Sequence, residues 1–221
     1  MTKIVIIGSG GLASDITTCF EGTSSKDYQD LQIKGYIDYE YNIDKYWKRY
    51  NFDNPVLDDI DNYSLQDDEY YVLGIADVRF RSKIINKVKE KGGKFINLIH
   101  PKSIINKASV LGTGNIIFPE CFVGGNVKIG DFNIFTLQSI VGHDCRVGNN
   151  NIIATSVISG HVKVGDDNFF SLRSTVIPRI TLGSRNIIQA GMIVDKDVGD
   201  GSVVFHRYRE KVTVIAGDTS A

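Results

Sequence analysis

The chain has 221 residues, three cysteines and a formal net charge of −1. Because there is no basic excess and no long basic face, we expect no nucleic-acid partner. No apolar run approaches the roughly 18 residues that a membrane span needs, and the N-terminus lacks the pattern of a signal peptide. We therefore expect no membrane partner. The cysteines are far apart and odd in number, which argues against a disulfide framework and favours a cytoplasmic protein.

The first hundred residues alternate between strand and helix patterns. Apolar runs predict strands at 3–7, 33–37, 70–74 and 95–99, with a short edge strand at 55–57. Helices are predicted over 12–20 and 79–91, and the polar stretch 39–66 shows only weak periodicity. This βαβ-like order predicts an α/β domain over residues 1–100, a small parallel sheet with helices on its faces that is similar to a truncated Rossmann unit.

A glycine-rich loop follows the first predicted strand. It reads Gly8-Ser9-Gly10-Gly11-Leu12-Ala13, a G-x-G-x-x-A match, and the second strand ends at Asp38, where a ribose-binding acid is expected. Such a loop lets backbone N–H groups and a helix N-terminus approach a phosphate. A tight turn beside an exposed acid is the alternative interpretation. A nicotinamide-dependent oxidoreductase is disfavoured because a second mononucleotide half is lacking.

Residues 101–204 carry an apolar residue at nearly every sixth position. The series is Ile105, Leu111, Ile117, Val123, Ile129, Phe135, Val141, Val147, then Ile158, Val164, Phe170, Val176, Leu182, Ile188 and Val194. This period predicts a parallel β-helix with three sixes to a triangular coil. The many Gly and Asn residues are expected at corners that need a positive φ. One residue is missing between Gly148 and Ile158, and such irregularity is expected near a functional site. Residues 205–221 are a tail.

The segment Gly142-His143-Asp144-Cys145 precedes this gap and occupies a predicted corner. A corner side chain points outward, so His143 can serve as a general base. An exposed histidine without a role is the alternative interpretation. No catalytic role is predicted for the other histidines, Cys145 is interpreted as a small buried residue, and no zinc-type ligand spacing appears, so no metal is expected.

Taken together, these motifs resemble one family. The ordered set comprises the glycine loop, Tyr36-Ile37-Asp38, Gly74-Ile75-Ala76-Asp77 with Arg81, Ile99-His100-Pro101, the sixes and Gly142-His143-Asp144-Cys145. It is similar to the hexapeptide-repeat sugar acyltransferases of the PglD/NeuD type, to about Val204. The resemblance implies a Rossmann-like domain followed by a left-handed parallel β-helix, and a homotrimer with active sites between prisms. It also implies acetyl-CoA as co-substrate and transfer to the 4-amino group of a UDP-, dTDP- or GDP-linked 4-amino-4,6-dideoxy sugar.

The resemblance also implies roles for individual residues. His143 would be the base, Asp144 its acidic partner, and Gly160 the glycine whose N–H faces the thioester carbonyl. The nucleotide-sugar contacts would come from Gly8, Ser9, Gly10, Gly11 and Asp38, with Asp77 and Arg81 as further candidates. Coenzyme contacts would come from Gly160, His161, Asn151, Arg173 and Arg179, with Lys163 and Arg185 as further basic residues.

The chain departs from the family pattern at three places. Many members have Asn where this chain has Thr136, and a second His at a position that maps to Ile152 or Asn151. The usual C-terminal turn is replaced by Phe205-His206-Arg207-Tyr208-Arg209, which puts the coenzyme contacts in doubt. Two other functions stay open, O-acetylation of a sugar hydroxyl of the sialic acid type and a non-catalytic nucleotide-binding module.

Overall fold

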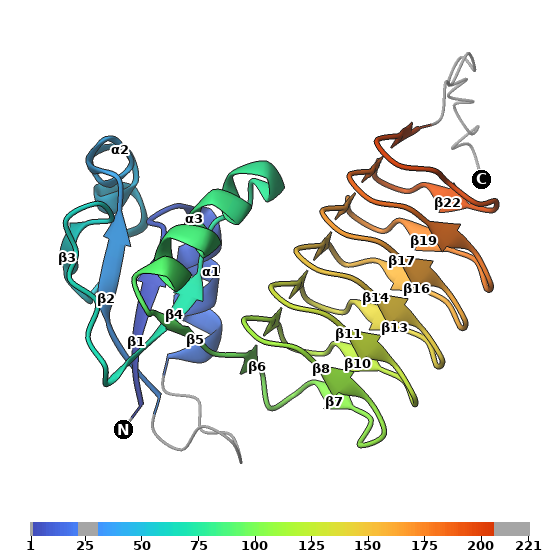
Figure 1. Cartoon of the computed structure of the whole chain (residues 1–221), viewed down its shortest axis with the longest axis horizontal. Helices are drawn as coiled ribbons and strands as arrows, with labels where there is room; N and C mark the ends of the chain where they lie inside the picture. Colours follow the sequence, from blue (N-terminus) through green and yellow to red (C-terminus); the bar gives the residue numbers. More distant parts are fainter. Residues whose placement is uncertain (1, 22–30, 206–221) are drawn as a thin grey trace, which may run out of the picture.

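The computed structural model describes residues 2–21 and 31–205, which form an α/β part followed by a stack of coils (Figure 1). The predicted tail, including His206, lies outside these residues apart from Phe205. No helix in the described ranges is long and apolar enough to cross a bilayer. The elements of the α/β part are β1 (Thr2–Ile7), α1 (Gly11–Phe20), β2 (Leu31–Asp38), α2 (Glu40–Tyr50), β3 (Val56–Asp59), β4 (Glu69–Leu73), α3 (Val78–Glu90) and β5 (Lys94–Phe95).

The first five strands form one parallel sheet in the order β3-β2-β1-β4-β5. Side chains of β1 alternate between its two faces, as a strand buried on both sides requires. Ile4 and Ile6 pack in one apolar cluster with Ile16 of α1. Val5 and Ile7 pack in another with residues of α3. Helices therefore cover both faces of the sheet, as the sequence predicts.

Two elements differ from the sequence prediction. Helix α2 lies in the stretch 39–66, for which no helix is predicted. The features that stabilise this helix are charges that complement its dipole, with Glu40 in the first turn and Lys48 and Arg49 in the last. Asn51 ends the helix in a left-handed conformation. The single strand predicted at 95–99 is wrong, because β5 pairs with β4 whereas β6 (Leu98–Ile99) pairs with β9 of the coils.

The coils are built from two-residue strands that form three parallel sheets, an arrangement typical of a left-handed β-helix. The first face contains β6, β9 (Ile116–Ile117), β12 (Ile134–Phe135), β15 (Ile152–Ile153), β18 (Phe169–Phe170), β21 (Ile187–Ile188) and β23 (Val203–Val204). The second face contains β7 (Ile104–Ile105), β10 (Phe122–Val123), β13 (Ile140–Val141), β16 (Val157–Ile158), β19 (Thr175–Val176) and β22 (Ile193–Val194). The third face contains β8 (Val110–Leu111), β11 (Lys128–Ile129), β14 (Arg146–Val147), β17 (Lys163–Val164) and β20 (Thr181–Leu182).

The predicted apolar series lines the inside of the coils. All of its members belong to one apolar cluster, which also contains Cys145 and Ile153. Because Ile153 continues the series, the missing residue falls between it and Ile158. The register agrees, since Phe135 pairs with Ile153 whereas Val141 pairs with Ile158. The short corner 154–156 therefore absorbs the gap.

The predicted reason for the corner glycines is wrong. Gly112, Gly130 and Gly148 do not have a positive φ, whereas twelve non-glycine residues between Glu120 and Arg185 do, one at each successive corner. A Cβ on any of these glycines would lie within 2.8 Å of the carbonyl oxygen of the stacked glycine in the next coil. Glycine is required there because the stacked backbones approach closely, and larger residues take the left-handed conformation.

Most of the predicted corner asparagines have a different role from the one expected. Each side-chain oxygen accepts a hydrogen bond from the backbone N–H of the next member, as between Asn133 and Asn151 at 2.9 Å. The stack stabilises the coils because it pairs buried polar groups that would otherwise lack partners. The ladder consists of Asn115, Asn133, Asn151, Asn168 and Asn186, all buried.

The α/β part packs on the outer side of the first face. Ile116, Ile134 and Ile152 point outward from the coils and join the same apolar cluster as Ile4 and Ile6. Further along this face the cover ends, and Val203 is 51% exposed. The sheet and the first coils thus share one core.

Candidate active site

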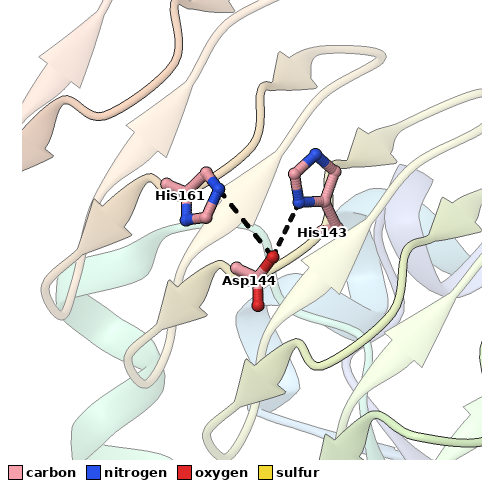
Figure 2. A group of neighbouring side chains, drawn as sticks. All are labelled: His143, Asp144 and His161. Atoms are coloured by element: carbon pink, nitrogen blue, oxygen red, sulfur yellow. Dashed lines mark hydrogen bonds and ion pairs between the residues drawn. The ribbon is translucent and has the colours of Figure 1, made fainter.

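The corner between β13 and β14 carries His143 and Asp144 (Figure 2). Asp144 has a φ of 60°, and the residues stacked above and below it at the same corner are Asn126, His161 and Arg179, which also have positive φ values. The side chains of His143 and Asp144 are 64% and 37% exposed. The corner side chains therefore face outward to solvent, as the sequence predicts.

His143 and Asp144 form a close polar pair. The Nδ1 atom of His143 lies 2.7 Å from Oδ2 of Asp144, and the amide of Asn126 donates to Oδ1 at 2.6 Å. The hydrogen bond from His143, followed by that from Asn126, lowers the pKa of Asp144. The carboxylate is thus ionised at neutral pH, so in the neutral imidazole the tautomer that donates from Nδ1 is favoured and Nε2 keeps its lone pair. Asn126 was not identified from the sequence, because only the stacking of coils brings it to Asp144.

His161 lies one coil beyond Asp144. Its Nε2 atom is 3.9 Å from Oδ2 of Asp144, and its ring centre is 5.1 Å from that of His143, with the rings nearly perpendicular. The sequence predicts a coenzyme contact for His161 and no part in the histidine–aspartate pair. The sequence shows that one coil is a residue short. It does not show that this shortened coil stacks His161 next to Asp144.

Gly160 lies directly beside the imidazole of His143. A Cβ at this position would be 3.0 Å from Nε2 and 3.1 Å from Cε1 of His143. The backbone N–H of Gly160 has no acceptor among the described residues. The glycine leaves space at Nε2 of His143 together with a free donor, which is compatible with the predicted place of Gly160 in the site.

A cleft of about 670 Å³ opens at the carboxyl ends of β1, β2 and β4. Its lining includes the predicted residues Gly8, Ser9, Gly10, Gly11, Asp38 and Asp77, together with Tyr41, Asn42, Tyr46, Arg49 and Tyr50 of α2. The residues from α2 were missed, since the helix itself was not predicted. The cleft lies at the point where the strand order changes direction between β1 and β4, the usual place for a ligand in a sheet of this kind.

Asp38 lines the cleft but is occupied by protein donors. Its Oδ2 accepts from the backbone N–H and the hydroxyl of Ser9, both at 2.8 Å, and its Oδ1 accepts from the N–H of Tyr39 and the amide of Asn42. A carboxylate offers about four acceptor positions, so none is left for a ribose hydroxyl. Asp38 is thus placed to hold the glycine loop, not to bind the ribose as predicted.

Asp77 begins α3. Its carboxylate accepts hydrogen bonds from the backbone N–H groups of Arg79 and Phe80, which makes it the cap of that helix. It also borders both the first cleft and a second one of about 650 Å³ between α3 and the first face of the coils. A capping role and a ligand contact are both compatible with this position.

Two predicted ligand contacts are contradicted by burial. Arg81 is fully buried and donates to Asn150 Oδ1, the Ile75 carbonyl and the Phe132 carbonyl. Burial lowers its pKa to about 9, and the guanidinium joins α3 to the coils, out of reach of the cleft. Asn151 is equally buried in the asparagine ladder, where both of its amide atoms are bonded, so it has no free group for coenzyme A.

The remaining basic residues lie at different corners. Arg179 shares the corner of His161, and its N–H donates to the carbonyl of Gly160 at 3.1 Å. Arg173 lies at the corner between the first and second faces, and Arg185 at the corner between the third and first. Within one chain the structure therefore places Arg179 at the same corner of the coils as His143, but not Arg173 or Arg185.

Comparisons with solved proteins give several matches over nearly the full chain. PerB from Caulobacter crescentus, in complex with CoA and GDP-perosamine, is 26% identical with a TM-score of 0.76, covering 91% of this chain and 92% of that one. The resemblance predicted from the sequence is confirmed. The acetyltransferase domain of PglB from Neisseria gonorrhoeae, in complex with acetyl coenzyme A, is 20% identical with a TM-score of 0.76, covering 91% and 95%.

WeeI from Acinetobacter baumannii is also 20% identical with a TM-score of 0.76, and covers 93% and 97%. At this identity PglB and WeeI support the fold. Neither the family models nor the curated protein sequences contain a match. A further structure from Caulobacter crescentus is described as a perosamine N-acetyltransferase, and the PglB domain as an acetyltransferase domain.

Proposed function

We propose that the protein transfers the acetyl group of acetyl-CoA to the 4-amino group of a nucleotide-linked 4-amino-4,6-dideoxy sugar. The observation that carries this proposal is the His143–Asp144 pair at 2.7 Å, placed at an exposed coil corner with Gly160 at its open side. Similarity to an enzyme crystallised with CoA and GDP-perosamine supports the substrate class.

His143 acts as the general base. The amine attacks the thioester carbonyl, the C–N bond forms, the C–S bond breaks, and the amine proton passes to Nε2 of His143. Asp144 fixes the tautomer that keeps this nitrogen free and stabilises the imidazolium, as the acid of a catalytic triad does. Base catalysis of this kind contributes about 10²–10⁴-fold. The proton then leaves with the thiolate of coenzyme A, so no acyl-enzyme is required.

The free N–H of Gly160 stabilises the oxygen that becomes negative in the tetrahedral intermediate. A backbone donor aimed at developing charge contributes more than one that bonds the ground state. Cys145 takes no part, because its sulfur is fully buried and burial raises the pKa of its thiol.

The α/β part binds the nucleotide. Residues 1–100 would form a Rossmann-like domain, residues 101–204 the acyltransferase β-helix, and residues 205–221 the tail. The strand order, the glycine loop at the start of α1 and the cleft at the switch point support this division. The tyrosines of α2 add aromatic surface for a nucleotide base.

The coenzyme lies along the coils near His143. His161 and Arg179 share its corner, and the adjoining third face carries Lys128, Arg146 and Lys163, three exposed cations stacked in register. Charge-assisted contacts from such a row suit the phosphates of coenzyme A. Of the basic residues considered from the sequence, Lys163 and Arg179 fit this position best.

A homotrimer completes the site. None of the residues that line the nucleotide cleft comes from the coils, so one chain holds two separate half-sites. The second face, which leads directly into the His143 corner, exposes Ile104, Phe122, Ile140 and Ile193. A second copy on this apolar row would be buried next to His143 and form the groove between prisms. A cytoplasmic location remains a prediction from the cysteines.

A thiol-release assay tests the function. Acetyl-CoA is supplied with UDP-, dTDP- and GDP-linked 4-amino sugars and with the corresponding 4-hydroxy sugars, and products are identified by mass. We expect release of coenzyme A with an amino sugar, and loss of release in His143→Asn. Release with hydroxy sugars alone would favour O-acetylation. Binding of a nucleotide sugar without any release would favour the non-catalytic module.

A further inference from the structure

Three side chains at the His143 corner converge on one point (Figure 2). One ligand atom from each of His143, Asp144 and His161 can be chosen such that all three lie within 4.8 Å of one another. Both histidines point a ring nitrogen at the same carboxylate oxygen, His143 Nδ1 at 2.7 Å and His161 Nε2 at 3.9 Å. The linear sequence has no metal-type spacing because His161 reaches this point from the next coil.

This arrangement matches the needs of a zinc ion. Two imidazoles and one carboxylate are common Zn²⁺ ligands, and ligand distances near 2.0 Å place neighbouring ligand atoms about 3.3 Å apart. The pairs at 2.7 and 3.9 Å lie on either side of that value, so small side-chain rotations suffice. The side chains of His143 and His161 are 64% and 46% exposed, which leaves room for water at the remaining positions.

A hydrogen bond from outside the cluster already orients the carboxylate of Asp144. Asn126 donates to Oδ1 of Asp144 at 2.6 Å, which leaves Oδ2 directed at the two histidines. Outer contacts of this kind hold ligands in place and strengthen metal binding.

We propose that His143, Asp144 and His161 form an inhibitory Zn²⁺ site. Zn²⁺ takes the Nδ1 lone pair of His143, the Oδ2 atom of Asp144 and the Nε2 lone pair of His161. In a neutral His143 the proton then moves from Nδ1 to Nε2, whereas a doubly protonated ring releases its Nδ1 proton to solvent and keeps the one on Nε2. A protonated Nε2 cannot accept the proton of an attacking amine. The ion is therefore an inhibitor of the transfer, not its cofactor, and this inhibitory role rests on the function proposed above.

Binding is tested without substrates. The full-length protein is titrated with ZnCl₂ by calorimetry and with CoCl₂ by visible absorption, in a buffer that does not chelate metals. We expect one ion per chain and a Co²⁺ spectrum with nitrogen ligands. His161→Asn should weaken binding by more than about tenfold, the effect of losing an outer contact alone. Asparagine is chosen because His161 has a φ of 62°, a conformation that asparagine accepts.

Cys19→Ser is the matched control, since Cys19 is the free cysteine that is not buried and a thiol could capture zinc elsewhere. This variant should bind as the wild type does. Equal Zn²⁺ affinity in the wild type and His161→Asn, or no binding at micromolar concentrations to the wild type, would overturn the site.

Inhibition is tested separately. Zn²⁺ should lower the rate of acetyl transfer in the wild type and in Cys19→Ser, and EDTA should restore it. At each Zn²⁺ concentration, His161→Asn should lose a smaller fraction of its zinc-free rate than the wild type loses. Zinc binding that depends on His161 but leaves the rate unchanged would refute the inhibitory role. If the protein binds zinc as expected but transfers no acetyl group, the proposed function fails while the metal site stands.

Discussion

Replacing Gly160 by alanine tests whether the space beside His143 is the reaction site. The new methyl group would lie 3.0 Å from Nε2 and 3.1 Å from Cε1 of His143, closer than ordinary van der Waals contact. The imidazole must then move by a few tenths of an ångström or more, which stretches its 2.7 Å contact with Asp144. Because misplacement by about 1 Å can lower a rate about 10²-fold, we expect kcat/KM to fall by roughly 10–10²-fold.

The matched control is Gly125→Ala. Gly125 occupies the equivalent corner position two coils earlier, where an added Cβ would meet its nearest atom, on Asn106, at 3.6 Å. Both variants should unfold near the wild-type temperature, since neither glycine has a left-handed φ. The assay is steady-state thiol release with calorimetric melting as the folding check. If Gly160→Ala keeps the rate of Gly125→Ala, the chemistry does not occur between Gly160 and His143.

Four further predictions address separate parts of the molecule. His143→Asn should lower kcat by about 10²–10⁴-fold, with little change in either KM or in Tm. It should also remove the limb of the kcat profile that rises with pH. Retention of more than about a tenth of the wild-type rate would exclude His143 as the base. Asn126→Gly removes one of two side-chain donors that hold the pKa of Asp144 down, so this pKa should rise in a carboxyl NMR titration. The ionised carboxylate that pairs with His143 is present above that pKa and lost as the pH falls through it, so in the variant it would be lost at a higher pH. An unchanged titration would contradict the contact. Gly10→Val should raise the KM for the nucleotide sugar while acetyl-CoA binding and Tm stay near wild type, because no atom lies within 4 Å of the added Cβ; equal loss of both substrates would mean that the loop is structural. Arg81→Met leaves the carbonyls of Ile75 and Phe132 without the donor they have in the wild type. It should lower the free energy of unfolding by about 2–6 kcal/mol in a denaturant titration. The control Arg79→Met changes a 95% exposed side chain on the same helix and should alter the free energy of unfolding little.

The repeats of the β-helix could be predicted because they follow from a single pattern, an apolar residue at every sixth position. Every sixth residue faces the inside of a coil, so the register of the apolar series follows from the sequence alone. The same pattern says nothing about which residues on neighbouring coils touch. The contact of Asp144 with Asn126 follows from the stacking of two full coils. Its contact with His161 depends on how the short corner 154–156 sets the stacking of the next coil, which the pattern does not reveal.

Other differences have local physical causes. Arg81 and Asn151 were assigned to ligands from the family resemblance, whereas here each is buried with its hydrogen bonds satisfied. Helix α2 was missed because its polar composition hides the helical period, and the tyrosines it brings to the nucleotide cleft were missed with it. Asp38 was correctly placed at the cleft, yet a sequence motif cannot show that Ser9 and Asn42 already use its oxygens.

The sheet that covers the outward side chains of Ile116, Ile134 and Ile152 also closes one end of a repeat array. In such arrays each coil is stabilised mainly by its neighbours, so a cap suppresses fraying at its own end only. Occupation of the nucleotide cleft would stabilise the α/β part by mass action, by about 2.7 kcal/mol at a hundredfold excess over Kd. That stabilisation would pass to the coils that share its core and fade toward β23. Amide hydrogen exchange would therefore record the arrival of a nucleotide as a gradient of protection along the stack.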